Sequence, residues 1–112
     1  MAIRMNKPFR PLTADEVGKL GGYLGVYEIA DAGGRVLRIG YAGGRSRFGL
    51  RGELQAELQA RGDGLSFRCE VTMQYLTRHK ELLMVHRADH HSLPPEQGPD
   101  AAVRGRLQPS KP

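Results

Sequence analysis

The chain has 112 residues, 39% of them hydrophobic, and a formal net charge of +5. This length allows one small domain, and the charge favours a polyanionic partner, although many soluble proteins are basic only for colloidal reasons. One cysteine excludes an intramolecular disulfide, and no apolar run approaches the ~20 residues that span a bilayer. The N-terminal residues lack the apolar core of a secretory signal, so we expect a cytoplasmic protein with no membrane association.

The N-terminal part predicts an arm followed by a short helix. Residues 1–12 contain two prolines and no hydrophobic periodicity, so we expect a flexible arm. Thr13 and Glu16 fit a capping box, in which the Thr13 hydroxyl accepts an amide and Glu16 reaches back. Three glycines within residues 17–22 predict that the helix is short.

A β-hairpin is predicted next, from a strand, a glycine turn and a second strand: residues 23–30, 31–34 and 35–41. Strand alternation places Arg38 on one face with Val36 and Gly40, and Tyr41 on the opposite face. Tyr27 shares the face of the first strand that Ile29 occupies.

The second half of the chain predicts a helix, a strand and a last helix. The helix begins near residue 46 or 48, ends near 60, and has a buried stripe of leucines: Leu50, Leu54 and Leu58. Residues 65–73 alternate as a strand whose apolar face runs from Leu65 to Met73 and includes Cys69, which we expect to be a buried structural thiol. Residues 77–91 form the last helix.

The order β-β-α-β-α predicts an α+β fold, with a small three-stranded antiparallel sheet flanked by helices. We expect the domain to cover residues 13–95. Residues 96–112 are rich in proline, glycine and polar residues and are expected to be disordered.

Four segments, in this order, resemble the GIY-YIG nuclease superfamily. Gly25-Val26-Tyr27 matches the first tripeptide, and Arg38-Ile39-Gly40 matches the second with its tyrosine replaced. Arg51 stands near the place of the arginine on the first long helix, and Glu81 stands at the place of the later glutamate. Pro94-Pro95-Glu96-Gln97 resembles the closing segment, so the resemblance covers about residues 13–97.

The resemblance implies a metal-dependent endonuclease that hydrolyses DNA phosphodiester bonds. Glu81 would bind Mg²⁺ or Mn²⁺, and Arg51, with Arg47 as the other register, would clamp the phosphate. Tyr27 would position or deprotonate the attacking water, which requires a nearby cation to lower the phenol pKa. The resemblance implies that Tyr41 and Arg38 support this site.

The departures from the family pattern support an alternative. Arg38 cannot act as a base, and Tyr41 replaces the missing hydroxyl only if a bulge at Gly40 shifts the phase of the strand. Gln55 stands where a histidine often occurs and cannot transfer protons. The alternative is therefore a catalytically weakened or inactive nucleic-acid-binding or adaptor domain of the same fold.

Each candidate residue also has a structural interpretation. Tyr27 fits an ordinary strand tyrosine, and Glu81 fits a surface ion pair with Arg78 or Lys80. His86 and His90 are four residues apart on one helix, which is compatible with a zinc pair but lacks the metalloprotease glutamate.

The glycine-rich loop before the first long helix favours contact with a nucleic-acid backbone. Arg45 and Arg47 would supply charge there, and the following helix N-terminus would favour the same phosphate. One small module contacts little DNA, so a homodimer or a protein partner would have to provide target specificity.

Overall fold

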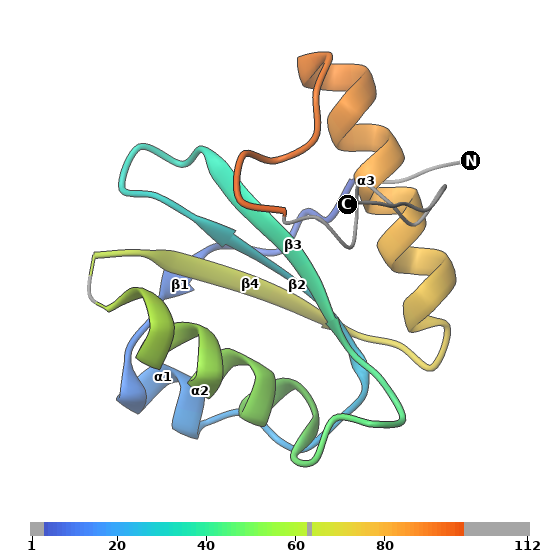
Figure 1. The fold of residues 1–112 in the computed structure, drawn as a ribbon. Coiled ribbons are helices and arrows are strands. Elements are labelled where there is room, and N and C mark those ends of the chain that lie inside the picture. The colour runs from blue at the N-terminus through green and yellow to red at the C-terminus, as the bar shows by residue number, and fades with distance from the viewer. Residues whose placement is uncertain (1–3, 63, 98–112) are drawn as a thin grey trace, which may run out of the picture.

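The computed structural model describes residues 4–62 and 64–97. Four antiparallel strands form one sheet in the order β1-β4-β2-β3, with α1 and α2 on one face and α3 on the other (Figure 1). The elements are β1 Arg10–Pro11, α1 Ala14–Gly18, β2 Gly25–Ala30, β3 Val36–Ala42, α2 Gly49–Arg61, β4 Ser66–Val71 and α3 Tyr75–His90. The α+β class is confirmed, with four strands where three were expected. None of the helices in these ranges is long and apolar enough to span a membrane.

The N-terminal segment supplies the additional strand. Arg10 and Pro11 pair with Phe67 and Ser66 of β4. Met5 and Leu12 are both buried, Leu12 in the core on the α2 side of the sheet and Met5 in the core on the α3 side. The expected flexible arm is therefore wrong from residue 4 onward, because two isolated apolar side chains anchor a segment that has no periodicity.

Helix α1 begins at the expected cap, although only half of the capping box forms. The Thr13 hydroxyl accepts the Glu16 N–H at 3.2 Å. The Glu16 carboxylate instead accepts hydrogen bonds from Arg10 and Lys19, each at 3.0 Å. The Thr13 N–H donates to the carbonyl of Pro11, so the backbone satisfies the group that Glu16 was expected to cap.

A bulge in the hairpin changes which face one residue occupies. Ile29 pairs with Arg38, but Ala30 pairs with Val36, so Leu37 is the extra residue. Val36 therefore packs into the core on the α3 side with Ile39, and its expected position beside Arg38 is wrong. Arg38 keeps its expected face, toward α2.

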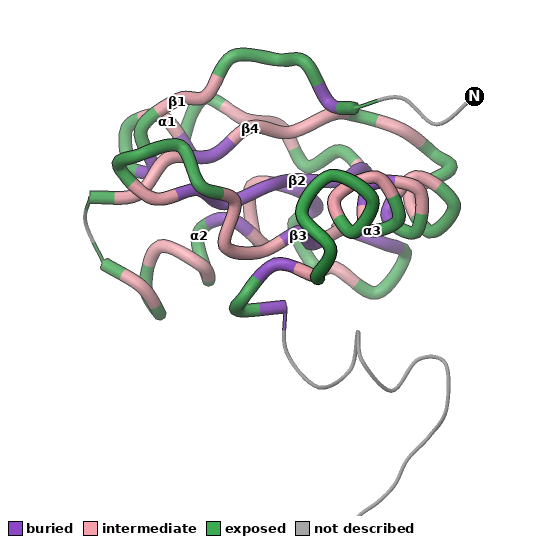
Figure 2. Tube along the Cα trace, turned by 90° about the horizontal axis from the view of Figure 1, so that it is seen from above, coloured by how far each residue is buried: buried purple, intermediate pink, exposed green. Residues whose placement is uncertain are grey.

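Two hydrophobic cores lie on opposite faces of the sheet, and the buried positions follow the central strands (Figure 2). The leucine stripe of α2 packs on the first core as expected. Cys69 is half-buried, and burial raises the pKa of its thiol, which fits a structural role. The buried part of the apolar face predicted for β4 ends at Cys69, since Val71 and Met73 are 60% and 76% exposed.

Candidate functional site

The glycines of the two tripeptides are required by packing. A Cβ at Gly25 would lie 2.1 Å from the carbonyl oxygen of Glu70, so only glycine lets β2 approach β4 there. A Cβ at Gly40 would lie 2.3 Å from Cζ of Tyr27, because the Tyr27 ring lies across the Gly40 backbone. These glycines therefore serve the contact between strands and the placement of one ring.

Tyr27 is buried and held as a neutral phenol. Its side chain is 2% exposed, and its hydroxyl donates a hydrogen bond to Oε2 of Glu57 at 2.6 Å. Burial and the adjacent Glu57 carboxylate raise the pKa of Tyr27 above its ordinary value, and the positive charge of Arg38 only partly opposes them. A catalytic phenol requires a lowered pKa, whereas this environment raises the pKa of Tyr27.

Glu57 joins Tyr27 to two arginines. Arg38 Nε donates to Oε2 of Glu57 at 3.0 Å, and Arg61 Nε donates to Oε1 at 2.7 Å. Burial acts to raise the pKa of Glu57, but the hydrogen bonds from Arg61 and Tyr27 and the two positive charges outweigh it and leave the pKa below its usual value. Glu57 is thus an ionised carboxylate that accepts hydrogen bonds from three side chains.

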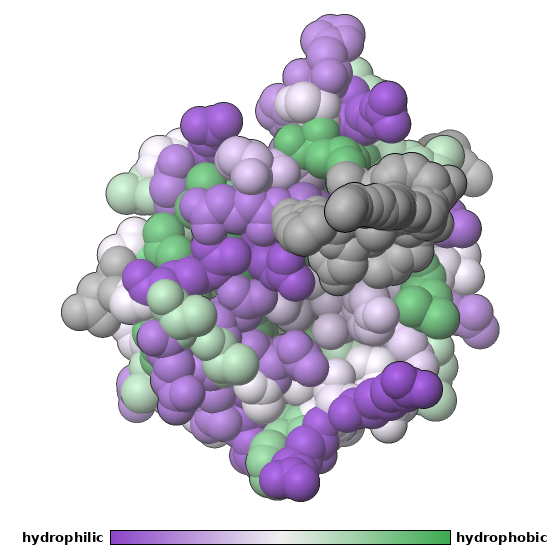
Figure 3. All heavy atoms as spheres, viewed as in Figure 1, coloured by the Kyte–Doolittle hydropathy of each residue, from purple (hydrophilic) through white to green (hydrophobic). Residues whose placement is uncertain are grey.

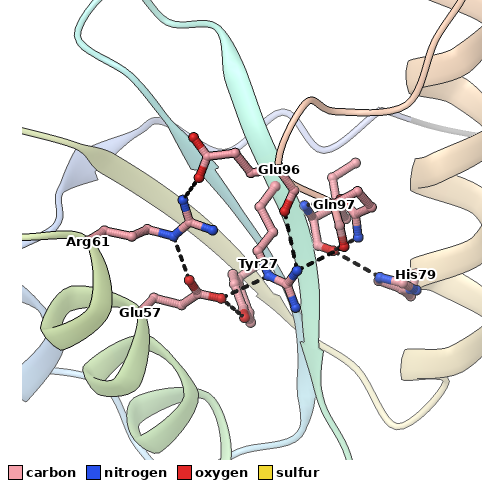
Figure 4. A network of polar contacts seen from close by, with 8 residues as sticks. Tyr27, Glu57, Arg61, His79, Glu96 and Gln97 are labelled. Atoms are coloured by element: carbon pink, nitrogen blue, oxygen red, sulfur yellow. Dashed lines mark hydrogen bonds and ion pairs between the residues drawn. The ribbon is translucent and has the colours of Figure 1, made fainter. Parts of the chain in front are cut away.

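The C-terminal residues of the described chain close this network, as Figure 4 shows. Arg61 pairs with the carboxylate of Glu96, and Arg38 donates to the carbonyl of Gln97 at 3.0 Å. The Gln97 side chain accepts the Ile39 N–H at 2.8 Å and donates back to the Ile39 carbonyl. Glu96 and Gln97 are therefore ordered and pair with the outer edge of β3, so the expected disordered tail does not begin at residue 96. Residues 98–112 lie outside the described range.

We call this set the strap network, and it consists of Tyr27, Arg38, Glu57, Arg61, Glu96 and Gln97. His79 lies at its margin on the α3 side, where Nε2 contacts the same Ile39 carbonyl at 3.0 Å. Every charged group of the network has an opposite charge or a backbone acceptor within it. Its evident role is to attach the closing segment to β3 and α2.

Glu81 and Tyr41 lie on the other side of the sheet. Oε1 of Glu81 accepts a hydrogen bond from Arg78 at 2.6 Å, and Arg78 also pairs with Glu70. The ring of Tyr41 stacks against Tyr75, with centroids 5.7 Å apart. The sheet therefore separates these residues from Tyr27.

Arg51 is also directed away from Tyr27. Its guanidinium reaches the carbonyl of Leu20 at 3.5 Å, between α2 and the segment that follows α1. Six residues separate it from Glu57, which turns the two side chains roughly 120° apart around the helix. The structure thus brings together Tyr27 and Arg38, but it does not bring Arg51 and Glu81 to them.

The surroundings of Glu81 do not fit the Mg²⁺ or Mn²⁺ expected there. A divalent cation at this carboxylate would lie beside the Arg78 guanidinium, and the two like charges would repel. No group of three or more histidine, cysteine, aspartate or glutamate side chains that could hold a metal occurs in residues 4–62 and 64–97. The rings of His86 and His90 lie close together, with centroids 4.4 Å apart and planes tilted by 37°, but the His86 Nδ1 contacts the Ser92 carbonyl.

Three loops meet at the end of the sheet where β2 begins and β3 and β4 end, at the bottom of Figure 1. The Leu50 N–H donates to the Tyr23 carbonyl at 2.8 Å, and the Thr72 N–H donates to the Leu24 carbonyl at 3.0 Å. The Tyr75 hydroxyl accepts the Gly44 N–H at 3.1 Å. We call this surface the loop end, and it comprises residues 20–24, 43–52 and 71–77.

The loop end is basic, and its residue ranges contain no aspartate or glutamate, although the carboxylate of Glu53 lies against it and accepts a hydrogen bond from the Ser46 hydroxyl at 2.7 Å. Arg45 and Arg47 are exposed, and neither makes a hydrogen bond or ion pair with any residue that the structure describes. The space-filling view shows hydrophilic side chains next to hydrophobic ones at this end (Figure 3). The bare backbone of Gly43 makes room for the Tyr75 ring, since a Cβ there would lie 2.6 Å from it, and not for a phosphate.

The start of α2 is not an open anion site. The Leu50 amide is used by Tyr23 and the Gly49 amide is directed at the Ser46 carbonyl. Phosphate contact at this end would therefore depend on the arginines, because these helix amides already have acceptors.

The sequence interpretation did not single out Glu57 or Arg61. Glu53, Glu57 and Arg61 recur every four residues beside the leucine stripe, and this charged column was the available signal. Gln97 was noted only as part of the closing segment, and no spacing in the sequence indicates its contact with Ile39, which lies 58 residues away.

The fold and its charges define a small basic α+β domain with a paired interior network and an unpaired basic end. Residues 3–89 match a family described as "Domain of unknown function (DUF7508)", and the chain belongs to that family. No curated protein and no solved structure matched it.

Proposed function

We propose that this protein is a nucleic-acid-binding domain, related in design to the GIY-YIG domains, that binds DNA through the loop end. The observation that carries the proposal is the pair Arg45 and Arg47, which are exposed and make no hydrogen bond or ion pair with any residue that the structure describes. Guanidinium groups in this state retain their full capacity to bind phosphate oxygens.

The loop that carries these arginines is held in shape by its own hydrogen bonds. The Ser46 hydroxyl accepts the Gly43 N–H at 3.0 Å and donates to Glu53 at 2.7 Å. Tyr75 fixes the next amide, that of Gly44. A loop that is already held in one conformation loses little conformational entropy on binding, and this lowers the free-energy cost of binding DNA.

The same geometry favours binding over cleavage. Tyr27 remains protonated, and Glu81 and Arg51 are directed to different parts of the molecule. The expected metal ligand Glu81, phosphate clamp Arg51 and base Tyr27 therefore do not lie together around one phosphodiester in this arrangement. We accordingly favour the non-catalytic form of the domain over the endonuclease.

Binding is tested with a labelled DNA duplex by fluorescence anisotropy over a range of salt concentrations. The variant Arg45→Glu/Arg47→Glu is compared with Arg35→Glu/Arg87→Glu, which changes two exposed arginines elsewhere and alters net charge equally. We expect the first to lose about tenfold or more in affinity and to flatten the log–log salt slope by roughly 1.8, for two phosphates. Equal weakening by both variants would show that only net charge matters and would contradict the proposal.

Cleavage is tested separately on supercoiled plasmid with Mg²⁺ or Mn²⁺. We expect wild type and Glu81→Ala to be indistinguishable, with neither nicking above background. Nicking by wild type that Glu81→Ala abolishes would establish the endonuclease instead.

A further inference from the structure

Two aromatic residues at the loop end are largely exposed, together with Val71, Met73 and Leu76 of the same surface. Tyr23 is 61% exposed and Phe48 is 55% exposed, and neither belongs to the two hydrophobic cores. Single exposed apolar residues are common, but several gathered at one end of a domain mark a surface that another molecule covers.

The two rings are mounted on adjoining backbone segments. The Tyr23 carbonyl accepts the Leu50 N–H at 2.8 Å, and a Cβ at Gly22 would lie 3.3 Å from the Phe48 carbonyl oxygen. Phe48 directly follows Arg47 in the chain. Backbone contacts therefore bring the segments that carry the rings and the arginines together at the loop end, within reach of a single ligand.

The charge of this surface selects the class of ligand. A protein partner would also use aromatic and arginine side chains. A polyanion is favoured because Arg45 and Arg47 are exposed and have no ion-pair partner among the described residues, in a chain of net charge +5. The loop end has arginines at 45, 47 and 51 and no aspartate or glutamate. This combination fits a polyanion that also presents flat apolar groups.

We propose that the loop end binds single-stranded nucleic acid, with unpaired bases stacking on Tyr23 and Phe48 and the backbone phosphates contacting Arg45 and Arg47. The inference rests on the proposed nucleic-acid binding and narrows it. Bases in a duplex are stacked on each other and do not offer their faces, whereas every unpaired base has a face that an aromatic ring can cover.

The test compares one labelled single-stranded oligonucleotide with the duplex of the same sequence. We expect wild type to bind the single strand about tenfold more tightly. Tyr23→Ala/Phe48→Ala should lose about tenfold or more for the single strand and remain within about threefold for the duplex. Tyr23→Phe/Phe48→Tyr, which keeps both rings, should bind like wild type. Met84→Ala, at an exposed apolar position on α3, is the matched control and should also bind like wild type.

The outcomes separate this inference from the proposal beneath it. Equal affinity of wild type for single strand and duplex, or unchanged single-strand affinity in Tyr23→Ala/Phe48→Ala, would overturn the single-strand inference and leave DNA binding intact. Absence of binding to both probes, even at low salt, would overturn the proposed function itself and would favour a protein partner. Thermal unfolding near the wild-type temperature shows that a loss of affinity in either variant is not a loss of fold.

Discussion

The strap network and the loop end use the same kinds of side chain in opposite ways. In the strap network Arg38 and Arg61 share the carboxylate of Glu57, and Tyr27 donates to it as well. At the loop end Arg45 and Arg47 have no such partner in the described structure, and the rings beside them are exposed. The difference suggests where a ligand would bind: the arginines of the strap network already have partners within the fold, whereas Arg45 and Arg47 have none among the described residues.

The largest effect is expected at Glu57, because three donors depend on it. Glu57→Ala should lower the free energy of unfolding by about 3–5 kcal/mol, since it leaves two guanidiniums without their shared half-buried carboxylate. Gln55→Ala, exposed on the same helix, should change it by less than about 0.5 kcal/mol. Urea denaturation measures both, and equal effects would show that the strap network contributes little.

A smaller loss is expected when the space for the Tyr27 ring is filled. Gly40→Ala places a Cβ against that ring in a buried strand, and should cost about 2–3 kcal/mol of unfolding free energy. Gly18→Ala meets nothing within 4 Å and serves as the control, with no expected loss and a gain of up to about 1 kcal/mol because alanine favours the helix of α1. A neutral Gly40→Ala variant would mean that Tyr27 moves easily, contrary to its role as a fixed structural group.

Gln97 tests how the closing segment is attached. Gln97→Ala removes both hydrogen bonds to Ile39 and should cost about 1–2 kcal/mol. The Ile39 amide should then exchange with solvent markedly faster, as measured by hydrogen exchange. Unchanged protection of that amide would show that the Gln97 side chain is not what holds the edge of β3.

The smallest effect at neutral pH is expected at Tyr27. Tyr27→Phe removes one donor to Glu57 and should cost about 1 kcal/mol. The pKa of Tyr27 is raised in the folded state from an ordinary value of 10.0, so the unfolded state releases this proton first as pH rises. Its contribution to stability is therefore complete below about pH 10 and declines above it. Denaturation curves at alkaline pH should fall more steeply for wild type than for Tyr27→Phe, and parallel curves would contradict the raised pKa.

The parts of the fold that the sequence predicts are those set by local spacing. The hairpin, the Thr13 cap and the Leu50–Leu54–Leu58 stripe all follow from contacts within a few residues. The two-residue strand β1 has no hydrophobic periodicity, and the bulge at Leu37 turns Val36 to the other face of the sheet. The hydrophobic pattern of the sequence predicts neither feature.

The candidate site was harder to predict because it depends on which face of the sheet each helix covers. Tyr27 and Arg38 were expected to lie near each other, and they do, through Glu57. Glu81 belongs to a helix that packs on the opposite face, and no local spacing indicates that choice. Burial, which decides the pKa of Tyr27, likewise depends on contacts between residues far apart in sequence.

The most direct test measures the affinity of wild type, Tyr27→Phe and Arg45→Glu/Arg47→Glu for one single-stranded oligonucleotide at several salt concentrations. If binding belongs to the loop end, Tyr27→Phe keeps the wild-type affinity and salt slope, while the arginine variant loses about tenfold or more and has a flatter slope. Loss of binding in Tyr27→Phe, with the arginine variant unaffected, would contradict the account and would show that the surface around Tyr27, not the loop end, binds the nucleic acid.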